Sequence, residues 1–379
     1  MRNFVLFAES WINGRVRLFL RGAGLAGLCL GLAGCALFSN ASDASMSFPA
    51  EDLSITTVGK LRLAPPKDDF SGIAWIGGRR YLVVSDKKDG YYEAELALDR
   101  TGRPISFVRG KFWGWPDVWR DCEGIAHVPS TGTVFIAAEN DQRIMEYANG
   151  IKTGRELEIP VVFRMAETNY GFESLSYDAR SGKFWTMTES TLPPDGPRAS
   201  GVSRGRNRLR LQGFGGDLKP VTQKAYLMDV PKASDMPTLA YAFGVSEIEV
   251  LPDGRILVLE REFYATKMGL GSWAHHKIFV IDPTNGPEVG EESTISNLPE
   301  ENFLPKALLW ESHAEFNGGN LANYEGMCLG PELPGGGRAL VLINDAQAQS
   351  ILDEYIFVLR LDLGEKPVES AKKSNFSKN

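Results

Sequence analysis

The chain has 379 residues, of which 43% are hydrophobic, 10% aromatic and 23% charged, and its formal net charge is −7. This length suffices for one large domain or two ordinary ones, and the composition excludes a fibrous or intrinsically disordered protein. The lack of a basic excess argues against a nucleic-acid-binding protein, and four cysteines are too few for a disulfide-built scaffold.

The first 34 residues have the features of an export signal. Four arginines up to Arg21 are followed by an apolar stretch, 22–32, that is too short and glycine-rich for a comfortable membrane span. Leu-Ala-Gly directly before Cys35 resembles the lipobox of bacterial lipoproteins, in which the signal is removed before a lipid-modified cysteine. The resemblance implies that Cys35 is the lipidated first residue of the mature protein. The alternative is an ordinary signal peptide with an incidental cysteine.

Two further segments are expected to lie outside the folded domain. Residues 35–51 are rich in Ser, Ala and Asp and indicate a flexible tether, whereas residues 365–379 indicate a disordered, solvated tail. The residue after Cys35 is Ala36, whereas an aspartate at this position would resemble an inner-membrane retention signal. We therefore expect a lipid anchor in the bacterial envelope, in the outer membrane facing the periplasm, as the only membrane contact.

A repeat organises the domain between residues 52 and 364. Five similar segments recur at 70–75, 122–127, 172–177, 245–250 and 324–329. A turn rich in Gly, Pro, Asp or Ser follows each segment. After the turn comes a β-branched or aromatic run that ends on an acid, at 81–86, 134–139, 184–189, 256–260 and 340–345. This pattern predicts five β-hairpins.

Large and small side chains alternate in the first strand of each hairpin. In the first repeat, for example, Ile73 and Trp75 alternate with Gly72 and Ala74. A period of two with one small face indicates a strand packed between neighbours in a crowded centre. The fourth repeat breaks the pattern, because Glu247 and Glu249 take the small positions.

Further strand-like runs complete four-stranded units. They are 92–98 and 105–112, 143–147 and 159–163, 209–214 and 223–230, and 277–282 and 307–310. After the fifth hairpin only 355–363 remains, and 53–63 from the other end of the domain can supply the missing strand. Termini that share one blade close a propeller ring. We predict an all-β fold, a β-propeller with five four-stranded blades closed by an N-terminal strand, and leave a sixth blade open in the long fourth repeat.

Carboxylates stand at the strand ends that face each other in these hairpins, and these ends should surround one mouth of the central channel. Eight of the ten equivalent positions are acidic: Asp86, Glu123, Glu139, Glu173, Glu189, Glu260, Glu325 and Asp345. So many acids repel one another unless a cation neutralises them or some hold protons. Oxygen ligands favour Ca²⁺ over zinc. The alternative is that these carboxylates only cap turns and pair with nearby basic residues.

The spacing of Ser-Gly-Ile, Asp-Cys-Glu-Gly-Ile-Ala, Gly-Phe-Glu-Ser-Leu, Leu-Pro-Asp-Gly-Arg-Ile-Leu-Val-Leu-Glu-Arg and Asn-Tyr-Glu-Gly-Met-Cys-Leu resembles the phytase-like domain, or esterase-like activity of phytase family. The likeness runs over about 53–363. The resemblance implies a β-propeller that hydrolyses phosphate esters or phosphodiesters at its repeated acids. The matching positions in this chain are Glu123, Glu139, Glu173, Glu260 and Glu325.

These arguments assign roles to individual residues. The expected calcium ligands are Asp86, Glu123, Glu139, Glu173, Glu189, Glu325 and Asp345, and the candidate catalytic carboxylates are Glu123, Glu173, Glu260 and Glu325. The candidate substrate-binding cations are Arg261, Arg143 and Lys87, for which surface salt bridges are an equal alternative. The expected substrate is a small-molecule phosphoester or other ester.

Two other functions remain open at this point. One is a non-catalytic propeller that binds a ligand or a protein of the cell envelope, and the other is a lactone or carboxylester hydrolase. The sequence leaves the oligomeric state open. Cys122 and Cys328 are expected to be buried and free rather than paired, and His127 is expected to pack in the core.

Overall fold

Strands account for almost all regular structure in the part of the chain that the computed structural model describes, which is residues 50–65, 67–85, 87–115, 120–317, 321–346 and 352–364. All of them belong to one unit, Ala44–Asn379. The predicted signal peptide, most of the tether, Cys35, Asp86 and the tail lie outside these residues. No helix among the described residues is long and apolar enough to cross a membrane.

The strands form five antiparallel sheets of four strands each. The first blade holds β2 (Phe70–Trp75), β3 (Arg80–Ser85), β4 (Lys88–Leu98) and β5 (Pro104–Gly114). The second holds β6 (Cys122–Val128), β7 (Thr133–Ala138), β8 (Arg143–Ala148) and β9 (Ile151–Glu156). The third holds β10 (Phe172–Asp178), β11 (Lys183–Thr188), β12 (Arg208–Phe214) and β13 (Pro220–Leu227).

The remaining two blades follow the same plan. The fourth holds β14 (Ala240–Val250), β15 (Ile256–Ala265), β16 (Trp273–Ile281) and β17 (Lys306–Glu315). The fifth holds β18 (Asn323–Glu332), β19 (Arg338–Asp345), β20 (Tyr355–Leu363) and, from the other end of the domain, β1 (Leu53–Arg62). The innermost strands β2, β6, β10, β14 and β18 contact one another in a closed ring, with β18 against β2. The predicted five-bladed propeller is confirmed.

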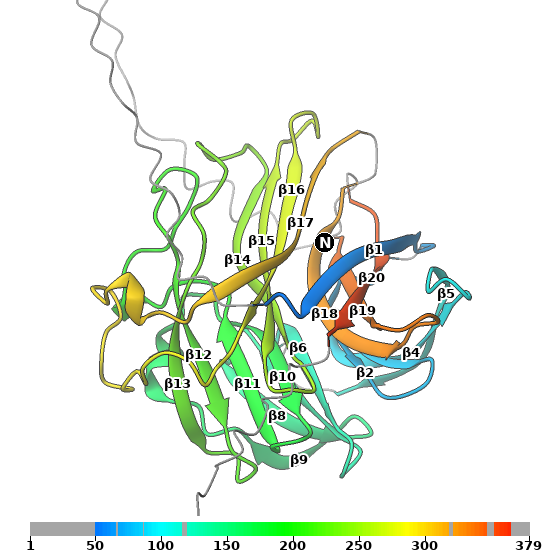
Figure 1. Cartoon of the computed structure of the whole chain (residues 1–379), viewed down its shortest axis with the longest axis horizontal. Helices are drawn as coiled ribbons and strands as arrows, with labels where there is room; N and C mark the ends of the chain where they lie inside the picture. Colours follow the sequence, from blue (N-terminus) through cyan, green and yellow to red (C-terminus); the bar gives the residue numbers. More distant parts are fainter. Residues whose placement is uncertain are drawn as a thin grey trace, which may run out of the picture. The chain divides into compact units, whose positions relative to one another are not determined.

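The first and last strands close the ring as predicted. β1 pairs antiparallel with β20, from Leu53 opposite Leu363 to Arg62 opposite Tyr355. Figure 1 shows the blue β1 beside the red β20. The fifth sheet therefore joins strands from both ends of the domain, so that the propeller has no free seam between its first and last blades.

The long fourth repeat contains no sixth blade within the described residues. Its extra length lengthens β14 and β15 to 11 and 10 residues and forms the loop between β16 and β17. That loop, which includes the 3₁₀ helix η3 (Glu300–Asn302), packs on β13, where Val289 N donates to Gln223 O and Leu304 N to Ala225 O, both at 2.8 Å.

One predicted strand is wrong. Residues 159–163 overlap the 3₁₀ helix η1 (Val161–Met165), and β9 is instead the fourth strand of the second blade. The reason is a tight turn. Asn149 and Gly150 both have positive φ, 51° and 77°, which suits a two-residue hairpin, so the chain pairs again at once. A third 3₁₀ helix, η2 (Pro193–Asp195), lies between β11 and β12.

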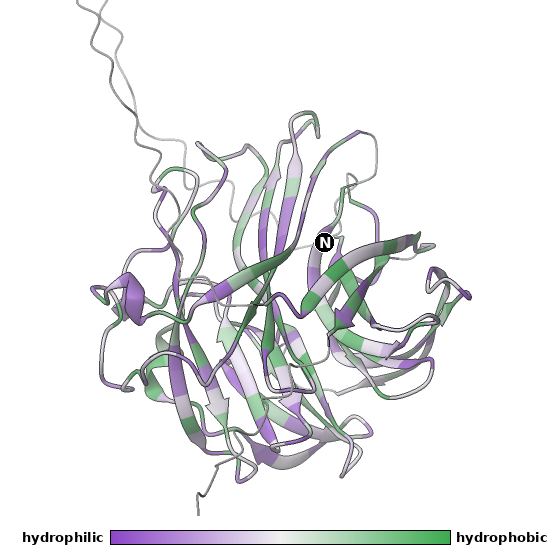
Figure 2. Cartoon of the chain, viewed as in Figure 1, coloured by the Kyte–Doolittle hydropathy of each residue, from purple (hydrophilic) through white to green (hydrophobic). Residues whose placement is uncertain are grey.

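Apolar side chains pack between neighbouring blades. Val83 and Leu96 of the first blade, for example, lie in one buried cluster with Val341 and Val358 of the fifth. Each such side chain contributes roughly 1.5–3 kcal/mol when it is fully buried. Hydrophobic and hydrophilic residues alternate along many strands, as the period of two requires (Figure 2).

Glycines on the innermost strands allow the blades to approach one another at the channel. A Cβ atom on Gly72 would lie 2.2 Å from the backbone oxygen of Glu123, and one on Gly326 would lie 2.5 Å from that of Ser71. The neighbouring backbone therefore occupies the space of a side chain. This explains the small face that the sequence shows in these strands.

Candidate functional site

Each innermost strand leaves its pairing register at the same point. The shifts lie between 70 and 73, 122 and 125, 172 and 174, 245 and 247, and 324 and 326. These shifts include, in blade order, Ser71, Glu123, Glu173, Ser246 and Glu325. A β-bulge bends the strand and re-aims a side chain, and bulges are common beside active sites. The repeated acids of the first strands therefore sit on repeated bulges.

Two groups of three carboxylates lie close together at this end of the channel. One oxygen from each of Asp121, Glu123 and Glu139 lies within 4.8 Å of the others, and the same holds for Glu139, Glu173 and Glu189. All five side chains are buried, with 3–8% of their surface exposed. Glu139 belongs to both groups. We call these five residues, together with Glu325, the acidic mouth.

A buried arginine joins one side of the acidic mouth. The Nη1 atom of Arg261 donates to Glu325 Oε1, and its Nη2 atom donates to Glu189 Oε1 at 2.9 Å. Nη2 also lies 3.9 Å from Glu173 Oε1. Arg261 is 5% exposed, so its charge is neutralised almost entirely by these carboxylates. The sequence proposed Arg261 as a substrate-binding cation, and the structure places it in the acidic mouth as an internal counter-ion.

The expectation that Glu260 would join the ring of acids needs correction. Its Oε1 accepts hydrogen bonds from Tyr226 Oη and Lys306 Nζ, both at 2.6 Å, away from the acidic mouth. The strand register gives the reason. In the fourth blade Val245 pairs with Glu260, and in the third blade the equivalent Phe172 pairs with Thr188. The next residue along the chain is Arg261 in the fourth blade and Glu189 in the third, so Arg261 takes the position of Glu189. The fourth blade thus contributes a cation where its neighbours contribute an acid.

The remaining predicted site residues, Asp345, Arg143 and Lys87, lie in different parts of the structure. Asp345 is buried opposite Asn323, at the end of β19. Arg143 is half exposed and its Nε atom donates to Glu156 Oε2 at 2.8 Å, so it pairs with the neighbouring strand. Lys87 is exposed. The structure therefore does not gather the three proposed substrate-binding cations into one site.

Burial and mutual repulsion change the protonation of the acidic mouth. Burial raises the pKa of Glu139 to about 8, the charge of Glu189 adds to this, and a hydrogen bond from Gly171 N at 2.8 Å opposes it. Burial and Glu189 also raise the pKa of Glu173, and Arg261 opposes that shift. Without a further cation, the site must hold protons at neutral pH.

Asp121 and Asn323 also lie beside these acids, although they were not among the predicted site residues. Each lies two residues before an acid of the mouth, and Asn323 Nδ2 donates to Glu325 Oε1 at 2.7 Å. The equal spacing Asp-x-Glu and Asn-x-Glu in two repeats could have identified them. Asp121 has a φ of 58°, and its backbone oxygen accepts from Glu139 N at 2.9 Å, which fixes the two acids side by side.

Two buried oxygens in this region, Asn323 Oδ1 and Ser71 Oγ, have no hydrogen-bond partner among the described residues. Buried polar atoms are normally paired, so these two can accept a ligand. His276, which pairs with Arg261 across β15 and β16, has a hydrogen-bond partner, unlike these two oxygens. Its Nε2 atom accepts from Tyr324 N at 3.0 Å, and burial lowers the pKa of the ring to about 3, so it remains neutral.

The other sequence expectations concern the thiols and His127. Cys122 and Cys328 are buried and free, as expected. His127 is half-buried and lines a cavity at the other end of the channel, so it takes no part in the acidic mouth.

Comparisons with known proteins give one family match. A family model described as "Phytase-like: Esterase-like activity of phytase" matches residues 66–346, which is well over half of the chain. The comparison with curated proteins finds no match.

Among solved structures, the chain is similar to a streptogramin B lyase (14% identity, 84% of this chain and 100% of that chain, TM-score 0.34). It is also similar to virginiamycin B lyase from Staphylococcus aureus (10%, 81% and 99%, TM-score 0.35). A third similar structure is an endo-arabinase from Bacteroides thetaiotaomicron (14%, 80% and 95%, TM-score 0.40). These likenesses are too weak to bear on function.

Proposed function

Because the chain belongs to the phytase-like family, that of the esterase-like activity of phytase, we propose that it is a metal-dependent hydrolase of phosphate esters or phosphodiesters that acts at the acidic mouth. Membership of the family supports hydrolysis by a propeller. The two clusters of three buried carboxylates, which share Glu139, support the binding of a metal ion.

The donor atoms of the acidic mouth fit a hard divalent cation such as Ca²⁺. Both groups of three consist of carboxylates, without the histidine and cysteine ligands that zinc prefers. The partnerless oxygens of Asn323 and Ser71 are also hard donors. Asp121, Glu123 and Glu139 are the residues that would hold the ion, because Arg261 already neutralises the other side.

When bound, such an ion polarises the phosphoryl or acyl oxygen and lowers the pKa of a coordinated water. Glu173 is the side chain best placed to accept a proton. It lies in the group with Glu139 and Glu189, its pKa is raised by burial, and it is not among the three residues proposed to hold the ion. Arg261 limits the negative charge that a phosphate would meet.

The same burial favours a second candidate function. The carboxylates are only 3–8% exposed and, within each group of three, one oxygen of each lies within 4.8 Å of the others, so a substrate could touch only the outer edge of the site. A structural cation in a non-catalytic binding propeller would need nothing more. The two functions differ in turnover alone, so the fold and the acidic mouth do not separate them.

The deciding experiment is a hydrolysis assay. Soluble protein that starts after Cys35 is incubated with chromogenic phosphomonoester, phosphodiester, carboxylester and lactone substrates, each with calcium and with chelator. Chelator-sensitive turnover of a phosphoester supports the proposal. Turnover of lactones or carboxylesters alone would replace it with another esterase, and folded, calcium-loaded protein without any turnover would favour the binding propeller.

We also propose that the protein is exported and held in the outer membrane by a lipid on Cys35. The arginine-rich start, the apolar stretch and Leu-Ala-Gly-Cys support this, and they all lie outside the described residues. Mass spectrometry of the mature N-terminus is the test. A diacylglyceryl cysteine at position 35 is expected, and a mature chain cut elsewhere would contradict the anchor.

A further inference from the structure

A cavity lies at the opposite end of the channel from the acidic mouth. It has a volume of about 360 Å³ and is lined by all five innermost strands. The acidic mouth lies where these strands begin, and the cavity lies where they end. Between the two, Glu247 is 1% exposed and reaches from β14 to β10, where its Oε1 accepts from Leu175 N at 3.1 Å. None of the residues of the acidic mouth lines this cavity, so the two ends are separate sites.

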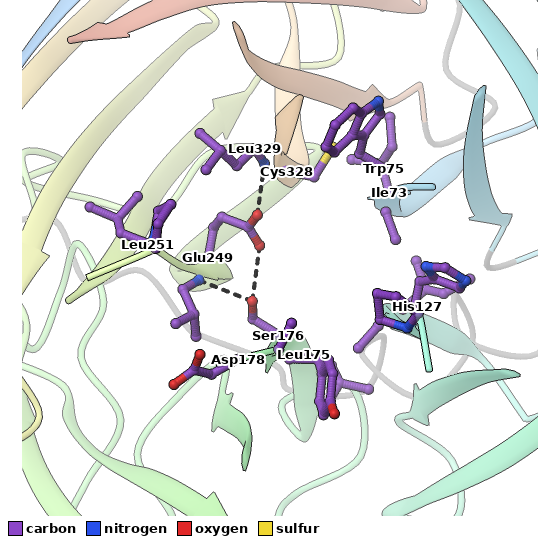
Figure 3. Close-up of a pocket in the computed structure, with 18 of the residues that line it drawn as sticks. Ile73, Trp75, His127, Leu175, Ser176, Asp178, Glu249, Leu251, Cys328 and Leu329 are labelled. Atoms are coloured by element: carbon purple, nitrogen blue, oxygen red, sulfur yellow. Dashed lines mark hydrogen bonds between the residues drawn. The ribbon is translucent and has the colours of Figure 1, made fainter. Parts of the chain in front are cut away.

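Two acidic side chains line this cavity, Asp178 at the end of β10 and Glu249 on β14. Glu249 occupies the position that small residues hold in the other four blades: Ala74, Ala126, Ser176 and Cys328. Its Oε1 accepts from Leu329 N at 2.8 Å and its Oε2 from Ser176 Oγ at 2.9 Å (Figure 3). Both donors are neutral. A partly buried carboxylate held by neutral donors gains most from a cationic ligand.

Aromatic rings and two arginines surround the entrance. Trp75, His127 and Tyr177 are equivalent residues of the first three blades, and all three are half-buried in the cavity wall. The guanidinium of Arg338 lies 5.3 Å from the centre of the Trp75 ring. Arg180 is 61% exposed and lies 3.4 Å from Asp178. The cavity thus has the carboxyl group of Glu249 within and two guanidinium groups at its entrance, one of them paired with Asp178.

We propose that this cavity binds a small zwitterionic molecule of the amino-acid type. Its ammonium group pairs with Glu249, its acidic group points to Arg180 and Arg338, and its side chain lies against the aromatic rings. The volume is at the lower end of the range for small-molecule sites, about 300–1,000 Å³. An acid without an amine would meet the carboxyl group of Glu249, and aromatic faces attract ammonium groups.

A purely structural role for Glu249 is the competing explanation, because its hydrogen bonds tie the third, fourth and fifth blades together. Glu249→Gln separates the two. The amide keeps an acceptor for Leu329 N and a group within reach of Ser176, so the fold should survive, but the negative charge is lost. A structural role alone predicts a change in thermal unfolding without any loss of ligand affinity.

The test is isothermal titration calorimetry of the mature chain with each of the twenty common L-amino acids. Any amino acid that binds is compared with its decarboxylated amine and its deaminated acid. We expect at least one amino acid to bind with a Kd below about 1 mM, and both analogues to bind at least tenfold more weakly. Absence of binding across the whole set, or an acid that binds as well as its amino acid, would overturn the proposal.

Variants locate the binding. Glu249→Gln should weaken it at least tenfold and leave calcium binding unchanged, whereas Glu123→Gln should weaken calcium binding and leave amino-acid binding unchanged. Arg180→Gln lies on the surface, folds regardless, and should weaken amino-acid binding several-fold. Equal affinities of Glu249→Gln, Arg180→Gln and the wild type would contradict the site. Because the two ends are assayed with different ligands, failure of this proposal is distinct from failure of the proposed hydrolase.

Discussion

Two sides of the acidic mouth use equivalent strand positions and balance their charge differently. On one side, Arg261 from the fourth blade joins Glu173, Glu189 and Glu325. On the other side, the second blade places Glu139 at the position equivalent to Arg261, beside Asp121 and Glu123. One cation is therefore built into the protein. On the second side, protons or a bound ion can balance the clustered carboxylates, and the raised pKa of Glu139 agrees with this.

The largest expected effect comes from the carboxylate that both groups share. We expect Glu139→Gln to lower calcium affinity by more than about 100-fold, since even the outer partners of metal ligands are worth 10–100-fold. Calorimetry with calcium measures it. Glu325→Gln is the matched control on the arginine side and should change calcium affinity much less. Equal losses in the two variants would contradict the division of the mouth.

Removing the built-in cation should make the protein depend on an external one. Arg261→Met removes the cation that pairs with Glu189 and Glu325, and loss of one member of a buried ion pair costs about 3–5 kcal/mol. Urea unfolding in chelator measures this loss, and added calcium should restore part of it. Arg210→Met is the control, because Arg210 binds Asp195 in an equally buried pair (2.6 Å) elsewhere in the third blade. Calcium should not rescue that variant.

The raised pKa of Glu139 predicts a pH dependence of stability in chelator. Its folded pKa is about 8 against an ordinary value of 4.5, so the folded state keeps a proton that the unfolded state has lost. The stability contribution is therefore present below pH 4.5 and is lost as the pH rises towards 8. We expect the Tm in chelator to fall by a few degrees over this range, and the fall to be smaller in Glu139→Gln. An unchanged slope in that variant would exclude Glu139 as the source.

The smallest effect on the acidic mouth is expected at Glu260. Glu260→Gln removes a charge that pairs with Lys306 at 2.6 Å, outside the mouth, so calcium affinity should change by no more than about twofold. Stability should fall, because the buried Lys306 loses one of its two ionic partners and keeps only Asp229, at 3.0 Å. Calorimetry and urea unfolding of the same sample separate the two effects. A large loss of calcium affinity in this variant would show that Glu260 does belong to the calcium site.

The period of two and the repeated hairpins suffice to predict the blades, the closure by β1 and most of the acidic mouth. The error at Glu260 has a physical cause. The hairpin of the fourth blade is one residue shorter from Val245 to its partner Glu260 than that of the third blade from Phe172 to Thr188. Glu260 therefore takes the position of Thr188, one residue before the position that faces the acidic mouth. Bulges shift the register at every repeat, and a strict alternation cannot place residues beyond them. The contact between Asp121 and Glu139 depends on a left-handed backbone at Asp121, which an alternation of side chains does not predict.

The most direct test of the central claim is the rate of phosphoester hydrolysis by the wild-type protein as a function of calcium concentration. The account predicts a saturable rise whose midpoint equals the Kd for calcium from calorimetry, and its absence in Glu139→Gln. Calcium that binds at the acidic mouth without any turnover of a phosphoester would contradict the hydrolase and leave a cation-stabilised binding propeller.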